Sequence, residues 1–541
     1  MSADTVSGTG EPGEAEGLGK TGAIGGSGTA MKSETVKETG DLGETGTVEE
    51  AGDAAETSRG RSRGWWNLPQ TPPLLLIVVL AATAYAVLGL VKLATFRAST
   101  FDLVIFDQAV SGYAGFGPPL EPSVGMFYGR GMDFVQLADH FSPIVALFAP
   151  LYWIHDGPET LIIAQAVLFA LAAIPIWRYA ERRLGAGSAY LVAAAYAVSW
   201  PVAQAAGFDV HEAAFVPLLS AIMIERSDAG RMPPAVVAAL GLLLVKEDMG
   251  LLVAGFGVYL FLTRRRLLGA AFVVFSLGAL VMIRSVLMPM AGSGEAGFHW
   301  AYGRWGQSLG EVALGLARDP LGALWQFVSP EIKVDTLAFL LWPVLLTALL
   351  SPLVLVALPL VAERFLADRP QWWGPEHHYN AFIVAILFCA AVDGVDRLGR
   401  RLRERDGGRN PRRDLGRPWA IAVCVIGITL IPRFALGNLV EWSFYEGDPH
   451  VAAAREAVAK VPDGVLVEAV NHAGPALTSR TTVLLWGPSA YGAPWIVADV
   501  DRWTFPFPTH DAQRQRVEQA LQEGYRKVYE RDGYVVLNRP S

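Results

Sequence analysis

Long apolar segments alternate with short polar clusters over most of the chain, from about residue 71 to residue 440. Segments of about 18 or more apolar residues are typical of helices that cross a bilayer. Only 18% of the residues are charged, below the roughly 25% of an average soluble protein. The mean hydropathy is +0.32. The pattern therefore predicts a polytopic α-helical membrane protein.

Basic residues between the apolar segments predict how the chain is oriented. Arg59, Arg61 and Arg63 precede the first apolar segment, and nine arginines lie between Arg397 and Arg417. Because such residues stay in the cytoplasm, the amino end is expected inside and the carboxyl end outside. About eleven crossings place these basic residues in the cytoplasm, at residues 72–94, 158–179, 186–203, 211–226, 233–246, 249–263, 267–289, 335–348, 351–362, 378–394 and 417–437. Over 233–263 and 335–362, one long helix is an alternative to two short ones.

Composition divides the chain into three regions. Residues 1–64 hold six basic and twelve acidic residues and cannot bury much apolar surface, which predicts a disordered cytoplasmic tail. Residues 65–440 are the expected transmembrane domain, with a large first outer loop at 95–157 that includes a short interfacial helix at 141–154. Residues 441–541 are the expected extracytoplasmic α/β domain.

The α/β assignment rests on short alternating segments. Asp532-Gly533 has the composition of a hairpin turn. Helices are expected at 451–460 and 512–523, and strands at 465–470, 483–486, 495–500 and 534–538.

Acidic residues gather in the first outer loop. Asp102 and Asp107 are five residues apart, which places them about 140° apart on a helix, although a loop–helix junction could turn both toward one cavity. Asp139 suits the N-cap of the short helix as well as it suits a functional site. His140 caps nothing and is the better candidate for a substrate contact.

More ionisable residues fall on the same predicted side, in turns between later crossings. Lys246, Glu247 and Asp248 interrupt an apolar stretch of about thirty residues. Three charges there are unfavourable by several kcal/mol unless they are paired or hydrated. A lysine–carboxylate pair facing a cavity is therefore favoured over a plain polar turn, which would more often carry Gly, Asn or Pro. His211, Glu212, Arg364, His377 and His378 are the other candidates on this side.

This set of residue types is compatible with an enzyme acting on a phosphate-linked lipid. A carboxylate can deprotonate an acceptor hydroxyl, and basic groups or a metal can neutralise a leaving phosphate. A divalent cation is the candidate cofactor, with Asp102, Asp107 and His378 as its candidate ligands, although no spacing matches a zinc signature.

Several segments together resemble a bacterial multi-pass family known as domain of unknown function 2079. They are residues 101–110, 139–143, 208–212, 245–248 and 377–383 in the membrane region, and Asn471-His472, Ala498-Asp499 and residues 530–538 in the outer domain. The resemblance covers about residues 70–540.

More distantly, the layout is similar to that of GT-C glycosyltransferases. That resemblance implies an enzyme that moves a sugar from a polyprenyl-phosphate donor to a glycan, lipid or protein acceptor of the cell envelope. It assigns the catalytic base to Asp107, with Asp102 as a second carboxylate or metal ligand. The expected substrate contacts are Asp139, His140, His211, Glu212, Lys246, Glu247, Asp248, Arg364, His377 and His378.

Two other classes of function remain open. A non-catalytic envelope scaffold would use the outer domain to bind a partner. Its acidic residues and histidines would then only cap helices and contact water. A transporter or flippase would place charges at mid-membrane and contain internal repeats, and the sequence has no convincing repeat. Membrane lipids are expected as partners in each case, and nucleic acid is not.

Overall fold

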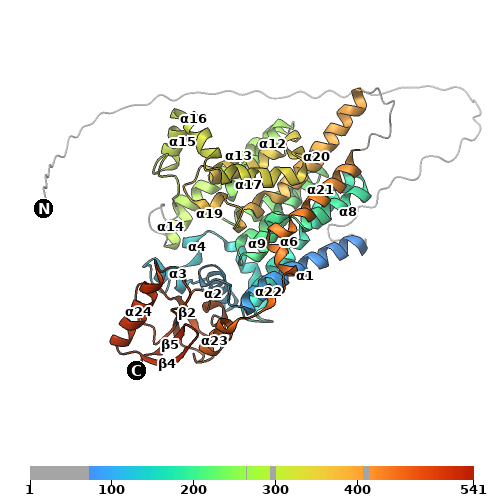
Figure 1. Ribbon diagram of the computed structural model, residues 1–541. Coiled ribbons are helices and arrows are strands. Elements are labelled where there is room, and N and C mark those ends of the chain that lie inside the picture. The colour runs from blue at the N-terminus through green and yellow to red at the C-terminus, as the bar shows by residue number, and fades with distance from the viewer. Residues whose placement is uncertain (1–71, 264, 293–299, 406–414, 541) are drawn as a thin grey trace, which may run out of the picture. The chain divides into compact units, whose positions relative to one another are not determined.

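The computed structural model describes residues 72–263, 265–292, 300–405 and 415–540 (Figure 1). The tail expected at residues 1–64 lies outside the described residues. Helices make up almost all of the described chain before residue 440, and a five-stranded sheet follows.

The apolar segments of the first part form helices because a backbone without water must satisfy its own polar groups. Within the described ranges, five helical segments are long and apolar enough to cross a membrane: Pro72–Ala94, Pro158–Leu184, Ala186–Gly207, Arg266–Ala291 and Gly416–Arg433. The individual helices are α1 (Pro72–Ala94), α6 (Pro158–Leu171), α7 (Ala173–Leu184), α8 (Ala186–Ala197), α9 (Trp200–Gly207), α10 (Phe215–Asp228), α11 (Met232–Leu243), α12 (Met249–Leu262), α13 (Arg266–Met282), α14 (Met288–Ala291), α15 (Leu309–Arg318), α16 (Pro320–Val328), α17 (Ile332–Leu341), α18 (Val354–Phe365), α19 (Pro370–Trp373), α20 (Ala381–Arg405) and α21 (Gly416–Leu430).

The structure resolves both places where one long helix was an alternative. α11 and α12 are separate helices of 12 and 14 residues. The crossing predicted at 335–348 is wrong in its second half, because α17 ends at Leu341. The chain then turns through Leu345 and Leu346, whose φ angles of 54° and 57° cannot continue a helix. The predicted number of eleven crossings is not established.

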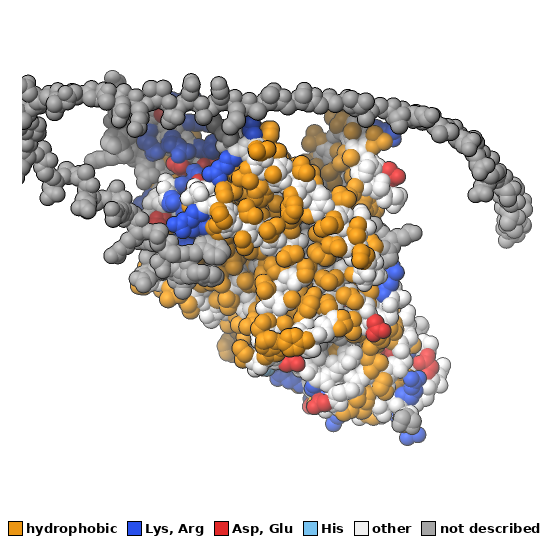
Figure 2. All heavy atoms as spheres, turned by 180° about the vertical axis from the view of Figure 1, so that it is seen from behind, with side chains coloured by type: hydrophobic (Ala, Val, Ile, Leu, Met, Phe, Trp, Pro, Cys, Tyr) orange, Lys and Arg blue, Asp and Glu red, His pale blue; other side chains and the backbone are white. Residues whose placement is uncertain are grey.

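Helix α20 is the centre of the membrane part. Its residues from Ala381 to Val395 are all buried, as expected for a helix that is apolar on every side. Helices at the periphery instead expose large apolar side chains, such as Leu76 on α1, Val274 on α13 and Ile428 on α21. Figure 2 shows apolar side chains covering the middle of one side of the molecule, with a cluster of lysine and arginine at the upper left and mixed charged side chains at the lower end. This distribution suits a surface that faces lipid.

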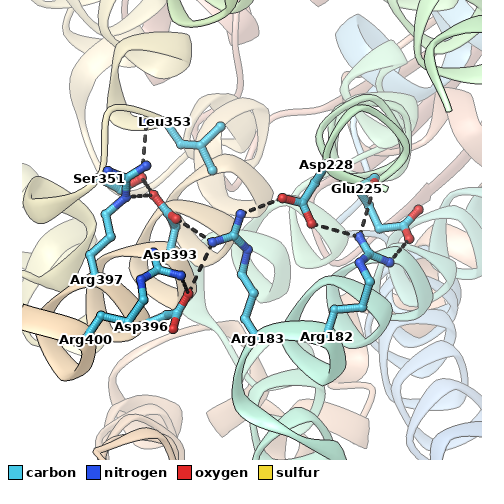
Figure 3. Close-up of polar contacts among 10 residues, drawn as sticks. All are labelled: Arg182, Arg183, Glu225, Asp228, Ser351, Leu353, Asp393, Asp396, Arg397 and Arg400. Carbon is cyan, nitrogen blue, oxygen red and sulfur yellow. Dashed lines mark hydrogen bonds and ion pairs between the residues drawn. The ribbon is translucent and has the colours of Figure 1, made fainter. Parts of the chain in front are cut away.

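Ion pairs join three helices at the carboxyl end of α20. This arginine network comprises Arg182, Arg183, Glu225, Asp228, Asp393, Asp396, Arg397 and Arg400 (Figure 3). Arg183 of α7 is central because it pairs with Asp228 of α10 at 2.5 Å and with Asp393 of α20 at 2.6 Å. Asp393 also accepts a hydrogen bond from Ser351 at 2.5 Å. The network fixes the ends of α7, α10 and α20 against one another.

Residues 95–157 form short helices between α1 and α6. They are η1 (Thr100–Val104), α2 (Ile105–Ala114), α3 (Pro122–Phe127), α4 (Gln136–Asp139), η2 (Pro143–Phe148) and α5 (Ala149–Tyr152). The short helix expected at 141–154 corresponds to η2 and α5. Asp139 is not its N-cap: it ends α4, and Ser142 stands at the N-cap position of η2.

The carboxyl-terminal part contains one sheet of order β2-β1-β3-β5-β4. Its elements are α22 (Trp442–Tyr445), α23 (Pro449–Val458), β1 (Leu466–Ala469), β2 (Thr482–Leu485), β3 (Trp495–Asp499), α24 (His510–Gln522), β4 (Arg526–Arg531) and β5 (Tyr534–Asn538). β1 is parallel to both β2 and β3, and β5 is antiparallel to β3 and β4. The predicted helices, strands and Asp532-Gly533 turn are present, whereas β4 was missed because its residues are mostly polar and exposed.

Candidate active site

The two aspartates of the 95–157 loop lie in different surroundings. Asp102 is in η1, a π-helix whose N-cap, Ser99, accepts a hydrogen bond from the backbone N–H of Phe101. Its Oδ1 lies 3.4 Å from Nε2 of His211, and a quarter of its side chain is exposed. Burial opposes ionisation, but the hydrogen bond and charge of His211 outweigh it and lower the pKa of Asp102. This carboxylate is both ionised and accessible.

Asp107 is enclosed. It is 2% exposed, its Oδ1 accepts a hydrogen bond from the Tyr152 hydroxyl at 2.6 Å, and its Oδ2 accepts one from the Thr478 hydroxyl at 2.7 Å. Burial raises the pKa of Asp107 to about 6, although both hydroxyls act in the opposite direction. With both oxygens engaged and 2% of the residue exposed, Asp107 is less accessible than Asp102.

Histidines from two distant segments stack beside Asp102. The rings of His211 and His378 are 3.7 Å apart at their centroids, with an interplanar angle of 23°. His378 is 4% exposed, and neither of its ring nitrogens has a hydrogen-bond partner among the described residues. His377 is half-buried and packs on Phe208 with ring centroids 5.0 Å apart. His378 therefore offers unused polar atoms next to an ionised carboxylate.

Glu212 follows His211 in the chain and forms a buried ion pair. Lys246 Nζ donates to Glu212 Oε1 at 2.7 Å, and the two side chains are 9% and 0% exposed. Glu212 Oε2 has no partner among the described residues. The predicted lysine–carboxylate pair is thus present, formed with a residue 34 positions away.

The next two residues of the turn are also matched with basic groups. Glu247 Oε1 lies 3.0 Å from Nδ1 of His140, and its Oε2 accepts from the backbone of Phe141. Asp248 Oδ2 lies 3.7 Å from the guanidinium of Arg364. Burial disfavours the Glu247 anion, but the charge and hydrogen bond of His140 hold the pKa of Glu247 well below its usual range.

These contacts define a polar cluster of four acid–base pairs: Asp102–His211, Glu212–Lys246, Glu247–His140 and Asp248–Arg364, with His378 stacked on one of them. The cluster is continuous because His211 precedes Glu212, and residues 246–248 are consecutive. Asp139 precedes His140 and is 7% exposed. Of the twelve predicted site residues, Asp107 is the one with its own separate set of partners.

Sequence reasoning missed several residues that support this site. Lys92 is the only charged residue of α1, and its Nζ pairs with Asp209 at 3.1 Å, two positions before His211. A lone lysine in an apolar segment is a usable signal. Tyr152, Thr478 and Asn471 gave no such signal, because ordinary polar residues become informative only once the fold brings them together.

No three His, Cys, Asp or Glu side chains within the described ranges are arranged to hold a metal ion. Asp107 is occupied by Tyr152 and Thr478. The expected set of Asp102, Asp107 and His378 does not fit a shared metal, and we derive no step through one.

An apolar pocket lies within the membrane part, between α8, α9, α17, α20 and α21. It is a narrow space of about 20 Å³, lined by residues that include Trp200, Phe339, Phe388 and Gly427. Helix α9 connects it to the polar cluster: Trp200 begins the helix, and Phe208, just beyond its end, packs on His377 and His378. Eight residues of helix span about 12 Å.

The fold and the site define a multi-pass membrane protein with a buried cluster of acid–base pairs and a small α/β domain. The chain belongs to the family described as "Predicted membrane protein (DUF2079)", whose profile matches residues 92–536. A search of curated proteins finds no match.

Among solved structures, the chain is similar to GT-C-fold glycosyltransferases at a distance. ArnT from Cupriavidus metallidurans, bound to undecaprenyl phosphate, is 15% identical with a TM-score of 0.48, over 86% of this chain and 97% of that one. The Archaeoglobus fulgidus oligosaccharyltransferase tethered with an acceptor peptide is 14% identical with a TM-score of 0.44, over 86% and 74%. A likeness at this level does not establish a shared activity.

Proposed function

We propose that this protein is a membrane glycosyltransferase that moves a sugar from a polyprenyl-phosphate donor to a cell-envelope acceptor. The observation that carries the proposal is the partly exposed Asp102 carboxylate, held ionised beside the His211–His378 stack. Burying four acid–base pairs at the end of apolar helices is unfavourable unless they serve a purpose, and perturbed ionisable groups gather where chemistry occurs.

Asp102 acts as the general base in this reaction. It takes the proton from an acceptor hydroxyl, and the hydroxyl oxygen attacks the anomeric carbon of the donor sugar. The new glycosidic C–O bond forms as the bond between that carbon and the phosphate oxygen breaks. The polyprenyl phosphate leaves with the electron pair of the broken bond. His211 keeps Asp102 ionised and oriented.

The leaving phosphate needs hydrogen-bond donors or positive charge. His378 is the best candidate, because its two nitrogens are buried and have no partner in the described parts of the chain. His377 is a second candidate at the same helix start. Arg364 is a third candidate, because its guanidinium lies 3.7 Å from Asp248 and its Nη2 is buried without a hydrogen-bond partner in the described chain. Lys246 is already hydrogen-bonded to Glu212, so it supplies background positive charge.

The apolar surface of the membrane part, with exposed side chains such as Leu76, Val274 and Ile428, suits contact with the polyprenyl chain of the donor. The pocket between the helices has only about 20 Å³ of free space, which is too little for such a chain. The arginine network at the opposite end of α20 favours a cytoplasmic location for that end, so the cluster and the α/β domain face outward.

The test compares lipid-linked sugars and envelope glycans by mass spectrometry in cells with and without the gene. Loss of one glycan with accumulation of its lipid-linked donor is expected. Asp102→Asn should fail to restore the glycan, whereas Asp133→Asn, which changes an exposed carboxylate of the same loop, should restore it. Full restoration by Asp102→Asn, or no glycan change in the deletion, would exclude the proposal.

A further inference from the structure

The end of β1 reaches across to the loop that carries Asp102. Asn471, two residues beyond β1 and 7% exposed, contacts three consecutive residues of that loop. Its carbonyl oxygen accepts from the backbone N–H and the hydroxyl of Thr100, both at 2.7 Å. Its side-chain Oδ1 accepts from the Ser99 hydroxyl and the Phe101 N–H, both at 3.2 Å. Four hydrogen bonds therefore converge from one residue on the first turn of η1.

Two of these bonds satisfy backbone N–H groups, of Thr100 and Phe101, that a helix start leaves unpaired. The other two hold the hydroxyls of Ser99 and Thr100. η1 is a π-helix, a wider and less stable turn that is frequent at functional sites. Asp102 is its third residue, directly after the two whose N–H groups bond to Asn471. The register of this turn decides where the Asp102 carboxylate points relative to His211.

The surrounding contacts allow little freedom. A Cβ at Gly474 would lie 2.1 Å from the Thr100 hydroxyl oxygen, so that glycine lets the two segments approach closely. His472 Nδ1 lies 3.2 Å from the carbonyl of Ala98, just before the turn. Burial lowers the pKa of His472 despite that backbone contact. The α/β domain is thus packed directly against the base-bearing turn.

We propose that Asn471 is a positioning residue for Asp102, and that the α/β domain completes the active site by setting the π-turn. This inference rests on the proposed function for its catalytic part, while its structural part, the ordering of residues 99–104, stands independently. It assigns the domain a role inside the site rather than that of a separate binding module.

The experiment uses the full-length protein in membranes. Asn471→Ala removes the Oδ1 acceptor, whereas Asn471→Asp keeps an acceptor oxygen in the same place. Asn538→Ala is the matched control, because Asn538 lies in the same domain and its side chain donates an exposed hydrogen bond to the carbonyl of Pro494, away from residues 99–104. Two quantities are measured: amide hydrogen–deuterium exchange of residues 99–104, and transfer kinetics with the lipid extract of the deletion strain, which holds the accumulated donor.

For Asn471→Ala we expect faster amide exchange at residues 99–104. We also expect kcat to fall by about 10- to 100-fold, because a base displaced by about 1 Å slows the chemical step. The KM for the donor should change little, since donor binding does not depend on the base. Asn471→Asp should retain most of kcat, and Asn538→Ala should match the wild type. If Asn471→Ala fails to fold, Ser99→Ala, which removes one of the Asn471 contacts, should show a smaller change of the same kind.

Unchanged amide exchange at residues 99–104 in both Asn471→Ala and Ser99→Ala would overturn the inference. Wild-type kcat in Asn471→Ala and Ser99→Ala would also overturn it, provided that Asp102→Asn is inactive. Full transfer by Asp102→Asn would instead remove the proposed function and leave the exchange result to decide the structural part.

Discussion

The imidazole rings of His211 and His378 lie face to face, with centroids 3.7 Å apart. Two positive rings at that distance would repel each other by about 4 kcal/mol at an effective dielectric constant of 20. The stack is therefore expected to carry at most one positive charge. His211 faces an acid, Asp102, whereas both nitrogens of His378 lack a partner in the described chain. The two rings thus have different surroundings: His211 contacts a carboxylate, and His378 has ring nitrogens that are available for a further contact.

Replacing His211 with phenylalanine should make transfer more sensitive to acid. His211 lowers the pKa of Asp102 against the effect of burial, so without it the pKa of Asp102 rises and the carboxylate is protonated at a higher pH. The acid limb of the pH–rate profile should move to higher pH. His378→Phe is the matched control, since it keeps a stacked ring and leaves the Asp102–His211 contact intact; its acid limb should stay in place while its rate falls by about 10²-fold. An unshifted limb in His211→Phe would contradict the base assignment.

Asp107→Asn should behave unlike Asp102→Asn. Asp107 touches Tyr152 and Thr478 rather than the polar cluster, so the asparagine variant should keep most of its transfer activity. Its effect should instead appear in stability. Burial raises the pKa of Asp107 from 3.8 to about 6, so the folded state holds a proton that the unfolded state releases.

The sign of that effect follows from linkage. The contribution of a group with a raised pKa is fully present below pH 3.8 and is lost as the pH rises through about 6. Asparagine does not titrate, so Asp107→Asn removes this pH-dependent loss of stability. Its Tm relative to the wild type should therefore be higher at pH 7 than at pH 4, measured by thermal unfolding in detergent. A Tm difference that is the same at both pH values would show that Asp107 is not protonated on folding.

Much of the fold followed from hydrophobic pattern, because apolar length and alternation are local signals. The α11–α12 break was predicted from Lys246, Glu247 and Asp248, and the β-hairpin from Asp532-Gly533. The failure at 335–348 has a physical cause: that stretch is apolar throughout, and only the backbone conformations of Leu345 and Leu346 reveal the turn. Hydropathy does not encode such a turn.

The candidate site was predictable by residue type but not by partner. Lys246 was expected to pair with a carboxylate, yet its partner is Glu212 rather than either of its neighbours in the turn. The sequence also did not reveal which of Asp102 and Asp107 is enclosed and which is partly exposed. Their sequence surroundings, Phe-Asp in both cases, are nearly alike, and only contacts from Tyr152, Thr478 and Asn471 distinguish them.

Breaking the Lys246–Glu212 pair should lower the stability of the fold more than removing both charges does. Lys246→Met leaves the buried Glu212 carboxylate without its partner, which should destabilise the fold by about 3–5 kcal/mol. Lys246→Met combined with Glu212→Gln removes both charges and should recover most of that loss. Thermal unfolding of the two variants in detergent measures the difference. Equal Tm values for the single and double variants would show that the pair is not electrostatically coupled.

Arg183 should be the residue on which the arginine network depends. Its guanidinium pairs with Asp228 on one side and with Asp393 and Asp396 on the other, so Arg183→Ala leaves Asp393, whose side chain is 2% exposed, with fewer partners. Because Arg183 is itself partly exposed, at 17%, we expect a loss of about 2–3 kcal/mol rather than the full value for a buried pair. Arg183→Lys should recover only part of the lost stability, since one ammonium cannot reproduce the planar set of N–H donors of a guanidinium. Arg405→Ala, which alters an exposed arginine at the end of α20, is the control and should leave Tm unchanged. A Tm for Arg183→Ala equal to that of Arg405→Ala would show that α7, α10 and α20 are held together by apolar packing alone.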